Sequence, residues 1–234
     1  MNTAVITPYK YCYDVLGNRT GVTEPDGTEN TYAYDALSQL RVKVTDTAGI
    51  KQTTEYTYDR LGRKETVTAL ADENNTAEKQ TTEYTYNNRG LITEVKYPNT
   101  SVTEKITYAY YPAGQVSKRT DQRGVITEYY YDKTYRLLEK KVDDTVDATE
   151  NTVLREKFTW DAMGRMLSAV KYAPDGTTVV SNSGFDYYDN GRVKQAVEDY
   201  AGLTAKTINY EYDQAARRTS TDPSSTVRGL NRHF

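Results

Sequence analysis

Chemically reactive residues are scarce in this chain of 234 residues, which has one cysteine and one histidine, His233. A single cysteine excludes an internal disulfide framework and a cysteine-based metal site. A single histidine beside the C-terminus argues against a Ser–His or Cys–His catalytic pair and against a histidine-ligated metal. The sequence therefore predicts no catalytic residue, no metal ligand and no cofactor.

Long apolar runs and an excess of basic residues are also missing. No apolar stretch approaches the roughly 18 residues that a membrane-spanning helix needs. The N-terminal residues MNTAVITPYKYCYD lack the basic region and apolar core of a signal peptide. The 30 lysines and arginines are offset by 33 aspartates and glutamates, so there is no basic footprint for nucleic acid. We expect neither a membrane span nor a nucleic-acid partner.

Tyrosine and threonine take the place of the scarce large aliphatic residues, with 23 and 35 copies. These aromatic and β-branched types fit a pleated, half-buried surface. The composition therefore predicts an all-β protein.

A Tyr-x-Tyr-Asp-x-x-Gly-Arg pattern recurs nine times, with about 21 to 29 residues between successive starts. The first position is aromatic in every copy: Tyr11, Tyr32, Tyr56, Tyr84, Tyr108, Tyr129, Phe158, Phe185 and Tyr210. So is the third position: Tyr13, Tyr34, Tyr58, Tyr86, Tyr110, Tyr131, Trp160, Tyr187 and Tyr212. Regular recurrence of this kind indicates a repeat array.

The remaining positions of the motif are less strict. The fourth is Asp in six copies: Asp14, Asp35, Asp59, Asp132, Asp161 and Asp213. The seventh is Gly in six copies: Gly17, Gly62, Gly90, Gly114, Gly164 and Gly191. Five copies have Arg at the eighth: Arg63, Arg136, Arg165, Arg192 and Arg217.

Each copy reads as a strand followed by a tight turn. Residues two apart on a strand share a face, so the two aromatics lie on one side of the sheet. Asp favours the start of a type I turn, and Gly supplies the left-handed residue of a hairpin with a G1 bulge. The copies with Ser38, Tyr135 or Ala216 in place of Gly must be strained there or use another turn. The repeated arginines are expected on the strand surface or as cross-strand partners.

A second strand follows the turn, with apolar residues at positions whose parity differs between copies, so some of these strands should bulge. More variable polar turns come next, and the longest, 69–79 and 143–151, are expected to protrude. A hairpin of about 25 residues cannot fold alone, so neighbours must stack. We expect about eighteen strands in one continuous domain, residues 1–234, ending in a short non-repeat tail, 224–234.

The motif resembles the YD repeat of the Rhs family from Tyr9 to about Pro223. The resemblance implies an antiparallel, twisted and curved sheet that forms part of a spiralling hollow shell. In the bacterial toxins of the family, this shell holds a C-terminal toxic domain until delivery. Nine copies are fewer than such shells contain, and Thr221 to Phe234 do not match the core that follows the repeats, so we expect a fragment or a short array.

Three functions follow from these patterns. The first is a non-catalytic segment of a secreted or cell-surface shell that encloses or presents a toxin or effector domain of the same polypeptide. The second is a carbohydrate-binding module, since tyrosines outside the strict columns can stack on sugars. Its candidate contacts are Tyr97, Tyr111, Tyr172, Tyr188 and Tyr200, with Tyr9, Tyr130 and Tyr135 as further members of this set.

An enzyme is the least favoured function, because a catalytic carboxylate is usually unique, whereas these aspartates recur with the turn. The oxygen-rich turns at 25–27 and 143–147 offer Ca²⁺ ligands without the spacing of an EF-hand loop. Unpaired strand edges at the two ends of the array predict either edge-to-edge pairing between copies of the chain or capping of the edges by its termini.

Overall fold

The computed structural model describes residues 8–47, 49–70, 79–98, 105–145 and 151–225. The chain divides into two compact units, Met1–Tyr108 and Ala109–Phe234. Eighteen antiparallel strands occur in the described residues, which confirms the predicted all-β hairpin array. None of these residues belongs to a helix long and apolar enough to cross a membrane.

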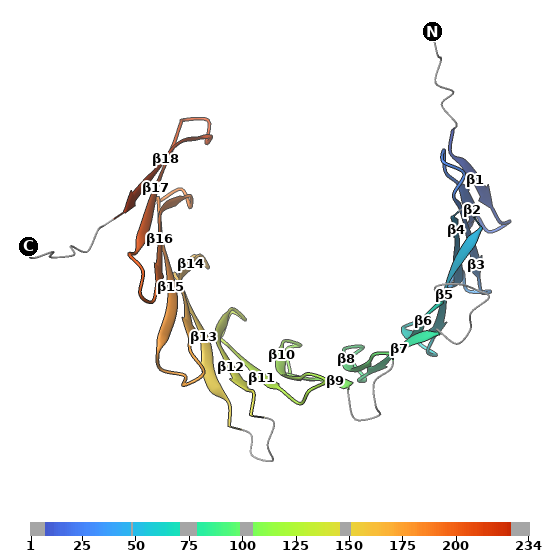
Figure 1. Ribbon diagram of the computed structural model, residues 1–234, viewed down its shortest axis with the longest axis horizontal. Coiled ribbons are helices and arrows are strands. Elements are labelled where there is room, and N and C mark those ends of the chain that lie inside the picture. Colours follow the sequence, from blue (N-terminus) through green and yellow to red (C-terminus); the bar gives the residue numbers. More distant parts are fainter. Residues whose placement is uncertain (1–7, 48, 71–78, 99–104, 146–150, 226–234) are drawn as a thin grey trace, which may run out of the picture. The chain divides into compact units, whose positions relative to one another are not determined.

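The first unit is a succession of hairpins in chain order (Figure 1). Its strands are β1 (Lys10–Tyr13), β2 (Arg19–Thr23), β3 (Glu29–Tyr34), β4 (Leu40–Thr47), β5 (Ile50–Tyr58), β6 (Lys64–Leu70), β7 (Gln80–Tyr86), β8 (Ile92–Lys96) and the greater part of β9 (Lys105–Tyr110). Each strand from β2 to β8 pairs with the strand before it and the strand after it.

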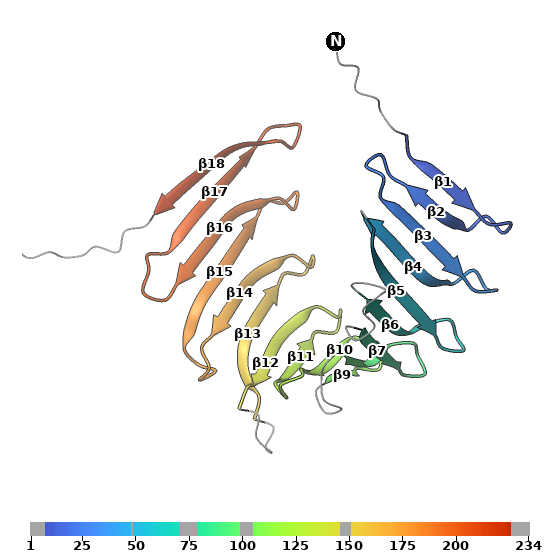
Figure 2. The same cartoon turned by 45° about the vertical axis from the view of Figure 1, so that its right-hand side comes forward.

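The second unit continues the same pattern, and Figure 2 shows its hairpins side by side. Its strands are β10 (Val116–Thr120), β11 (Ile126–Tyr131), β12 (Leu137–Asp143), β13 (Val153–Trp160), β14 (Met166–Tyr172), β15 (Val179–Tyr187), β16 (Val193–Tyr200), β17 (Lys206–Tyr212) and β18 (Arg218–Ser225). β18 includes Ser224 and Ser225, so the first two residues of the expected tail belong to a strand. The remainder, 226–234, lies outside the described residues.

The motif turn has one geometry in all nine copies. The seventh residue donates its N–H to the fourth residue's carbonyl, as in Gly62 to Asp59 at 3.0 Å. Ser38, Tyr135 and Ala216 adopt the same turn with φ of 59°, 65° and 71°. These three copies therefore retain the turn and accept a left-handed conformation that costs a non-glycine residue about 1 kcal/mol.

A further bulge follows this turn and lies on the second strand of the hairpin. The pairing register shifts between the second and third motif positions, for example between Thr57 and Tyr58 and between Thr159 and Trp160. At these points the pairing passes over Glu65 and Leu167, so the shift is a bulge of the second strand, as the parity of its apolar positions predicts. It is separate from the G1 bulge, which forms at the turn itself, where the N–H of Gly62 and the carbonyl of Arg63 both bond to Asp59.

Neighbouring hairpins separate near their motif turns. The last backbone pair toward the turn is Thr66 with Glu83 between β6 and β7, and Ser168 with Gly184 between β14 and β15. In both cases the aromatic positions follow directly after the last pair. The backbone ladder therefore ends where the aromatics begin, and the carbonyls there need other partners.

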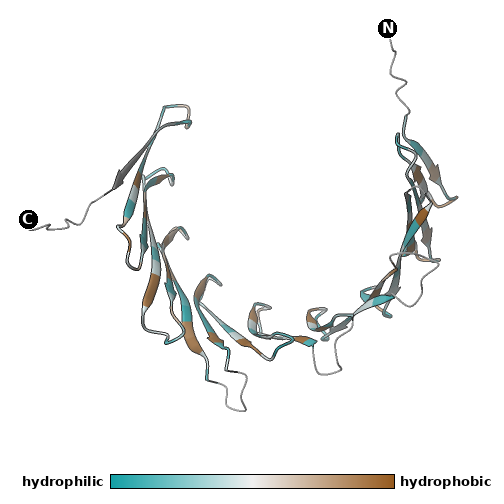
Figure 3. Cartoon of the chain, viewed as in Figure 1, coloured by the Kyte–Doolittle hydropathy of each residue, from teal (hydrophilic) through white to brown (hydrophobic). Residues whose placement is uncertain are grey.

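Very little of the described chain is buried. The buried hydrophobic residues are Leu70, Val95, Ile106 and Ala196. Figure 3 shows hydrophobic and hydrophilic residues interspersed along the strands. The aromatic columns are half-buried in the second to ninth copies. Each hairpin is therefore held mainly by its neighbours in the sheet, since the described residues provide no second packed layer.

Threonine supports the sheet through cross-strand hydroxyl pairs. The hydroxyls of Thr57 and Thr66 lie 2.7 Å apart, and those of Thr68 and Thr81 lie 2.9 Å apart. Such pairs stabilise facing strands and account for part of the high threonine content. The centres of the two long predicted loops, 71–78 and 146–150, lie outside the described residues.

Candidate functional site

Aspartate at the fourth position caps its own turn. Asp59 Oδ1 accepts hydrogen bonds from the backbone N–H groups of Leu61 and Arg63 at 2.9 and 3.0 Å. The same pair of bonds forms at Asp14, Asp35, Asp132 and Asp161. The recurring aspartates are thus explained by turn geometry.

Arginine at the eighth position joins that turn to the next hairpin. Arg63 Nε donates to Asp59 Oδ2 at 2.6 Å, while its Nη1 donates to the backbone carbonyl of Asn87 at 3.1 Å. Its guanidinium also lies 4.5 Å from the ring centroid of Tyr86. We call this arrangement the Asp–Arg clamp: a carboxylate orients a guanidinium, which then stacks on one residue of the next hairpin and bonds to another.

The clamp recurs in the second unit. Arg136 contacts Asp132 at 2.6 Å and donates to the carbonyl of Asp161 at 2.8 Å. Arg165 contacts Asp161 at 2.5 Å and donates to the carbonyl of Tyr188 at 3.1 Å. Their guanidinium groups lie 6.0 and 4.5 Å from the rings of Trp160 and Tyr187.

The clamp lowers the pKa of its carboxyl group. The Arg63 side chain, followed by backbone N–H donors, holds the pKa of Asp59 below its ordinary value. The backbone N–H of Arg136, with the Thr134 hydroxyl and the Arg136 side chain, lowers the pKa of Asp132 well below its usual range. Each of these donors stabilises the ionised carboxylate.

The third-position aromatic supplies the reverse connection. The Tyr86 hydroxyl donates to the carbonyl of Lys64 at 2.7 Å, and the Trp160 indole N–H donates to that of Leu137 at 2.8 Å. Tyr34, Tyr58 and Tyr187 make the same bond to Arg19, Leu40 and Met166. In every case the acceptor lies two residues beyond the seventh position of the preceding copy. These hydrogen bonds satisfy backbone carbonyls that lie beyond the last backbone pair between the two hairpins.

Two copies have tyrosine in place of the turn aspartate. The hydroxyls of Tyr111 and Tyr188 donate to the carbonyls of Tyr129 and Tyr210 at 3.1 and 3.0 Å. Their rings meet those of Tyr131 and Tyr212 edge to face, with centroids 6.0 and 6.2 Å apart. Tyrosine therefore connects neighbouring hairpins in a different way from the clamp.

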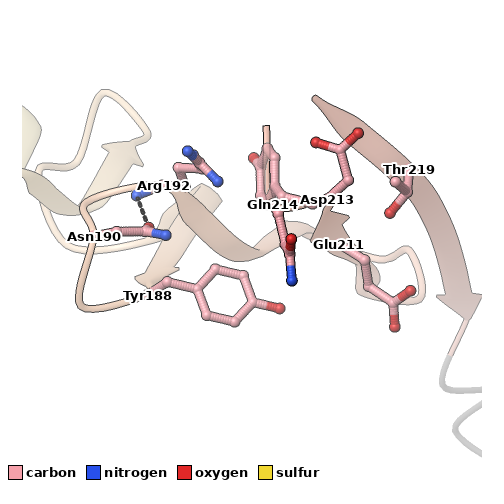
Figure 4. A pocket seen from close by; sticks show the side chains of 8 residues that line it. Tyr188, Asn190, Arg192, Glu211, Asp213, Gln214 and Thr219 are labelled. Carbon is pink, nitrogen blue, oxygen red and sulfur yellow. Dashed lines mark hydrogen bonds between the residues drawn. The ribbon is translucent and has the colours of Figure 1, made fainter. Parts of the chain in front are cut away.

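A cleft lies beside each of these tyrosine turns. The Tyr111 cleft, about 310 Å³, is lined by Tyr111, Pro112, Ala113, Gln115, Tyr130, Tyr131, Asp132 and Tyr135. The Tyr188 cleft, about 610 Å³, is lined by Tyr188, Asn190, Arg192, Glu211, Tyr212, Asp213, Gln214 and Thr219. Figure 4 shows the Tyr188 ring and the side chains of Arg192, Glu211 and Gln214 around the larger cleft.

The two clefts occupy equivalent places in the repeat. Each is bounded by the fourth and eighth positions of one copy and by the second to fourth positions of the next. No Asp–Arg clamp forms at either place, since the fourth residue is tyrosine. These clefts are the candidate binding sites of the described chain.

The tyrosines proposed from the sequence as glycan contacts do not form one site. Tyr111 and Tyr188 line different clefts, and Tyr200 lines a smaller hollow of about 170 Å³ beside Phe158. Tyr172 is half-buried at the end of β14, and Tyr97 is exposed after β8. Tyr130 and Tyr135 join Tyr111 in its cleft, whereas Tyr9 stacks on Tyr11 with centroids 6.3 Å apart.

Sequence reasoning missed the residues that distinguish the clefts, above all Gln115. The signal was available as a coincidence of two departures from the motif, tyrosine at the fourth position and glutamine at the eighth.

The carboxylates of the oxygen-rich turns accept hydrogen bonds from nearby residues. Asp26 Oδ1 accepts the N–H of Thr28 at 2.9 Å, and Asp143 accepts bonds from Thr145 and Asn151. Asp147 lies outside the described residues. Within the described ranges, no three His, Cys, Asp or Glu side chains gather in a way that could hold a metal ion.

Comparison with known families identifies the repeat. Residues 13–51, which include the motif turns at Asp14 and Asp35, match the family model described as RHS Repeat. This match confirms the resemblance to the YD repeat of the Rhs family over these residues. Among curated proteins, none matches the chain.

Several solved structures are similar at low identity. The crystal structure of TcdB2-TccC3 without its hypervariable C-terminal region gives 15% identity and a TM-score of 0.42 over 95% of this chain and 16% of that one. The crystal structure of TcdB2-TccC3-Cdc42 gives 14% identity and a TM-score of 0.39 over 92% and 15%. A Photorhabdus luminescens Tc holotoxin pore with a mutated TccC3 gives 15% identity and a TM-score of 0.39 over 87% and 14%. The chain spans 14–16% of the length of these solved chains.

Proposed function

We propose that this array is a non-catalytic wall segment of a secreted Rhs-type shell. The shell would enclose or present a toxin or effector domain of the same polypeptide that is not part of this sequence. The observation that carries the proposal is that the side chains of the motif form bonds between neighbouring hairpins. The Asp–Arg clamp and the third-position donor both join one hairpin to the next, so the repeated chemistry serves construction of a wall.

Protease protection of the enclosed domain tests this function. In the full-length polypeptide that carries the array, the domain beyond the repeats should resist added protease until the repeats are unfolded by denaturant. Rapid digestion of that domain while the repeats remain folded would contradict an enclosing role. A shell of this kind also predicts that the array behaves as one continuous domain in unfolding experiments.

Carbohydrate binding is a second candidate, favoured by the exposed rings of Tyr97 and Tyr200. A tyrosine ring offers a sugar an apolar face and a polar tip. A glycan array that includes bacterial wall polysaccharides tests it, with Tyr97→Ala and Tyr200→Ala as variants. Specific binding that both substitutions abolish would support it, whereas a blank array from folded protein would remove it.

Pairing between copies of the chain is the third element of the proposal. β1 pairs only with β2 and β18 only with β17 among the described strands. The last clamp is half complete, because Arg217 contacts Asp213 at 2.7 Å and its side chain is 81% exposed, against 26–28% for Arg63, Arg136 and Arg165. Tyr13, the first third-position aromatic, is 61% exposed. When two copies of the chain pair edge to edge, Arg217 beside β18 of one copy would meet Tyr13 on β1 of the other.

A further inference from the structure

The chain shows three times how it binds a guanidinium group. At Arg63, Arg136 and Arg165 the group lies over the third-position ring of the next hairpin and donates to the carbonyl of that hairpin's fourth residue. The carbonyl has room for this bond, since that of Asp161 also accepts the N–H of Gly164 at 3.1 Å.

The Tyr111 cleft offers the same ring and carbonyl, but the eighth position beside it has no arginine. The third-position ring there is Tyr131, and the fourth-position carbonyl is that of Asp132, which accepts the N–H of Tyr135 at 3.0 Å. The eighth residue of the preceding copy is Gln115, which carries no guanidinium. Gln115, Tyr131 and Asp132 all line the cleft.

We propose that the Tyr111 cleft binds an arginine side chain of a protein partner. The guanidinium stacks on Tyr131 and donates to the Asp132 carbonyl, as the chain's own arginines do at the three clamps. Tyr111, Tyr130 and Tyr135 supply further aromatic surface around its aliphatic stem. Lysine fits less well, because only the planar guanidinium can stack on the ring and present a fork of N–H donors at the same time.

Two carboxylates lie at the cleft or beside it. The Asp132 carboxylate lines it, and Glu128 Oε2 lies 2.8 Å from the hydroxyl of Tyr130, another lining residue. Two nearby cations have contacts of their own: Arg136 contacts Asp132 Oδ2 at 2.6 Å and donates to the Asp161 carbonyl on the following hairpin, and the Lys141 ammonium lies 4.8 Å from the ring centroid of Tyr130.

The Tyr188 cleft provides an internal contrast. Its eighth-position residue is Arg192, whose guanidinium already lies 5.2 Å from the centroid of Tyr212. The ring that would receive an external arginine is therefore occupied by the chain itself. Selective binding at the Tyr111 cleft follows, and this inference does not rest on the proposed shell function.

An NMR titration of the isotope-labelled chain with the capped peptide acetyl-Gly-Arg-Gly-amide tests the proposal. We expect saturable shifts at Ala113, Gln115 and Tyr131, and no saturable shift at Arg192 or Tyr212. The matched peptide with Lys in place of Arg should bind more weakly, by a factor of about five at least. Equal binding of the two peptides, or shifts centred on Tyr212, would overturn the assignment.

The variant Gln115→Arg supplies the missing group from the chain itself. Five copies already have Arg at this position, so the substitution suits the fold. We expect it to abolish peptide binding and to raise the melting temperature. Tyr131→Leu, which removes the stacking ring, should also abolish binding. Unchanged affinity in both variants, or no saturable shift in the unsubstituted chain, would show that the cleft is not an arginine site.

Discussion

At the residue scale, the two aromatic columns have different requirements. The first position accepts Phe158 and Phe185, whereas the third is always Tyr or Trp. The reason is that five of the third-position side chains donate hydrogen bonds to backbone carbonyls of the preceding hairpin. The first position needs only an aromatic surface.

Removing a single hydroxyl tests this difference. Tyr86→Phe leaves the Lys64 carbonyl without its 2.7 Å donor and should lower the free energy of unfolding by about 1 kcal/mol. Tyr84→Phe, in the first column of the same copy, should change it by less than about 0.5 kcal/mol. Urea denaturation measures both, and equal losses would mean that the hydroxyl contributes nothing specific to the third position.

The left-handed seventh residue gives a second test. Ala216→Gly should stabilise the chain by about 0.5–1 kcal/mol, because glycine adopts the φ of 71° without steric cost. Gly191→Ala, in the neighbouring copy, should destabilise it by about 1 kcal/mol, since φ is 85° and no neighbouring atom lies within 4 Å of the added methyl group. Thermal unfolding measures both signs, and matching signs would rule out backbone strain as the cause.

At the scale of the element, the motif turn is where one hairpin is fastened to the next. Backbone pairing between neighbouring hairpins stops before the turn. Beyond that point, the Asp–Arg clamp reaches from one hairpin to the next, and the third-position donor reaches back to the preceding hairpin. Asparagine can keep the turn without the clamp, as Asn87 does by accepting N–H bonds from Arg89 and Leu91 at 2.9 and 3.1 Å.

The clamp predicts a loss of stability in acid. The folded-state pKa values of Asp59, Asp132 and Asp213 lie below their ordinary value. A depressed carboxyl pKa contributes stability that is present above the unfolded pKa of about 4 and is lost as pH falls through the folded value. We therefore expect the free energy of unfolding to decrease steadily below about pH 4.

Asp132→Asn isolates one clamp in that pH profile. It keeps the turn bonds in the manner of Asn87 and removes the contact with Arg136. The variant should be less stable than the unsubstituted chain at pH 7, and the difference should shrink toward pH 2 in urea unfolding. A difference that is constant with pH would show that the carboxylate charge plays no part.

At the scale of the whole molecule, the described residues form no conventional core, and each hairpin depends on contacts with its neighbours. Few of the described side chains are buried, and the clamps and third-position donors join neighbouring hairpins. A fold of this kind is stabilised by neighbour contacts. Its two outer strands therefore present contacts that another hairpin of the same kind can complete.

Sedimentation velocity over a range of protein concentrations tests pairing of these edges. We expect reversible oligomers that Arg217→Ala weakens, because Arg217 would donate to a carbonyl of the next copy. Arg218→Ala, a change of the adjacent residue, serves as the control. A monomer at every concentration would contradict edge-to-edge pairing.

The repeat, its strands and its motif turns can all be predicted from the amino-acid sequence. Period-two aromatics and Asp-x-x-Gly spacing are local signals, because strand direction and turn geometry depend on residues only a few positions apart. The differing parity of the apolar positions on the second strand predicted the bulge there. For the copies with Ser38, Tyr135 and Ala216, the sequence allowed either a strained turn of the same kind or a different turn. The structure shows the same turn with positive φ.

The contacts of the motif side chains, in contrast, could not be predicted from the sequence. Arg63 and Asn87, or Tyr86 and Lys64, are 22 or 24 residues apart and meet only when two hairpins lie side by side. The spacing in sequence cannot reveal that the strands separate near the turn, because that depends on where the backbone ladder between hairpins ends. The same separation opens the clefts at Tyr111 and Tyr188, where tyrosine replaces the aspartate of the clamp.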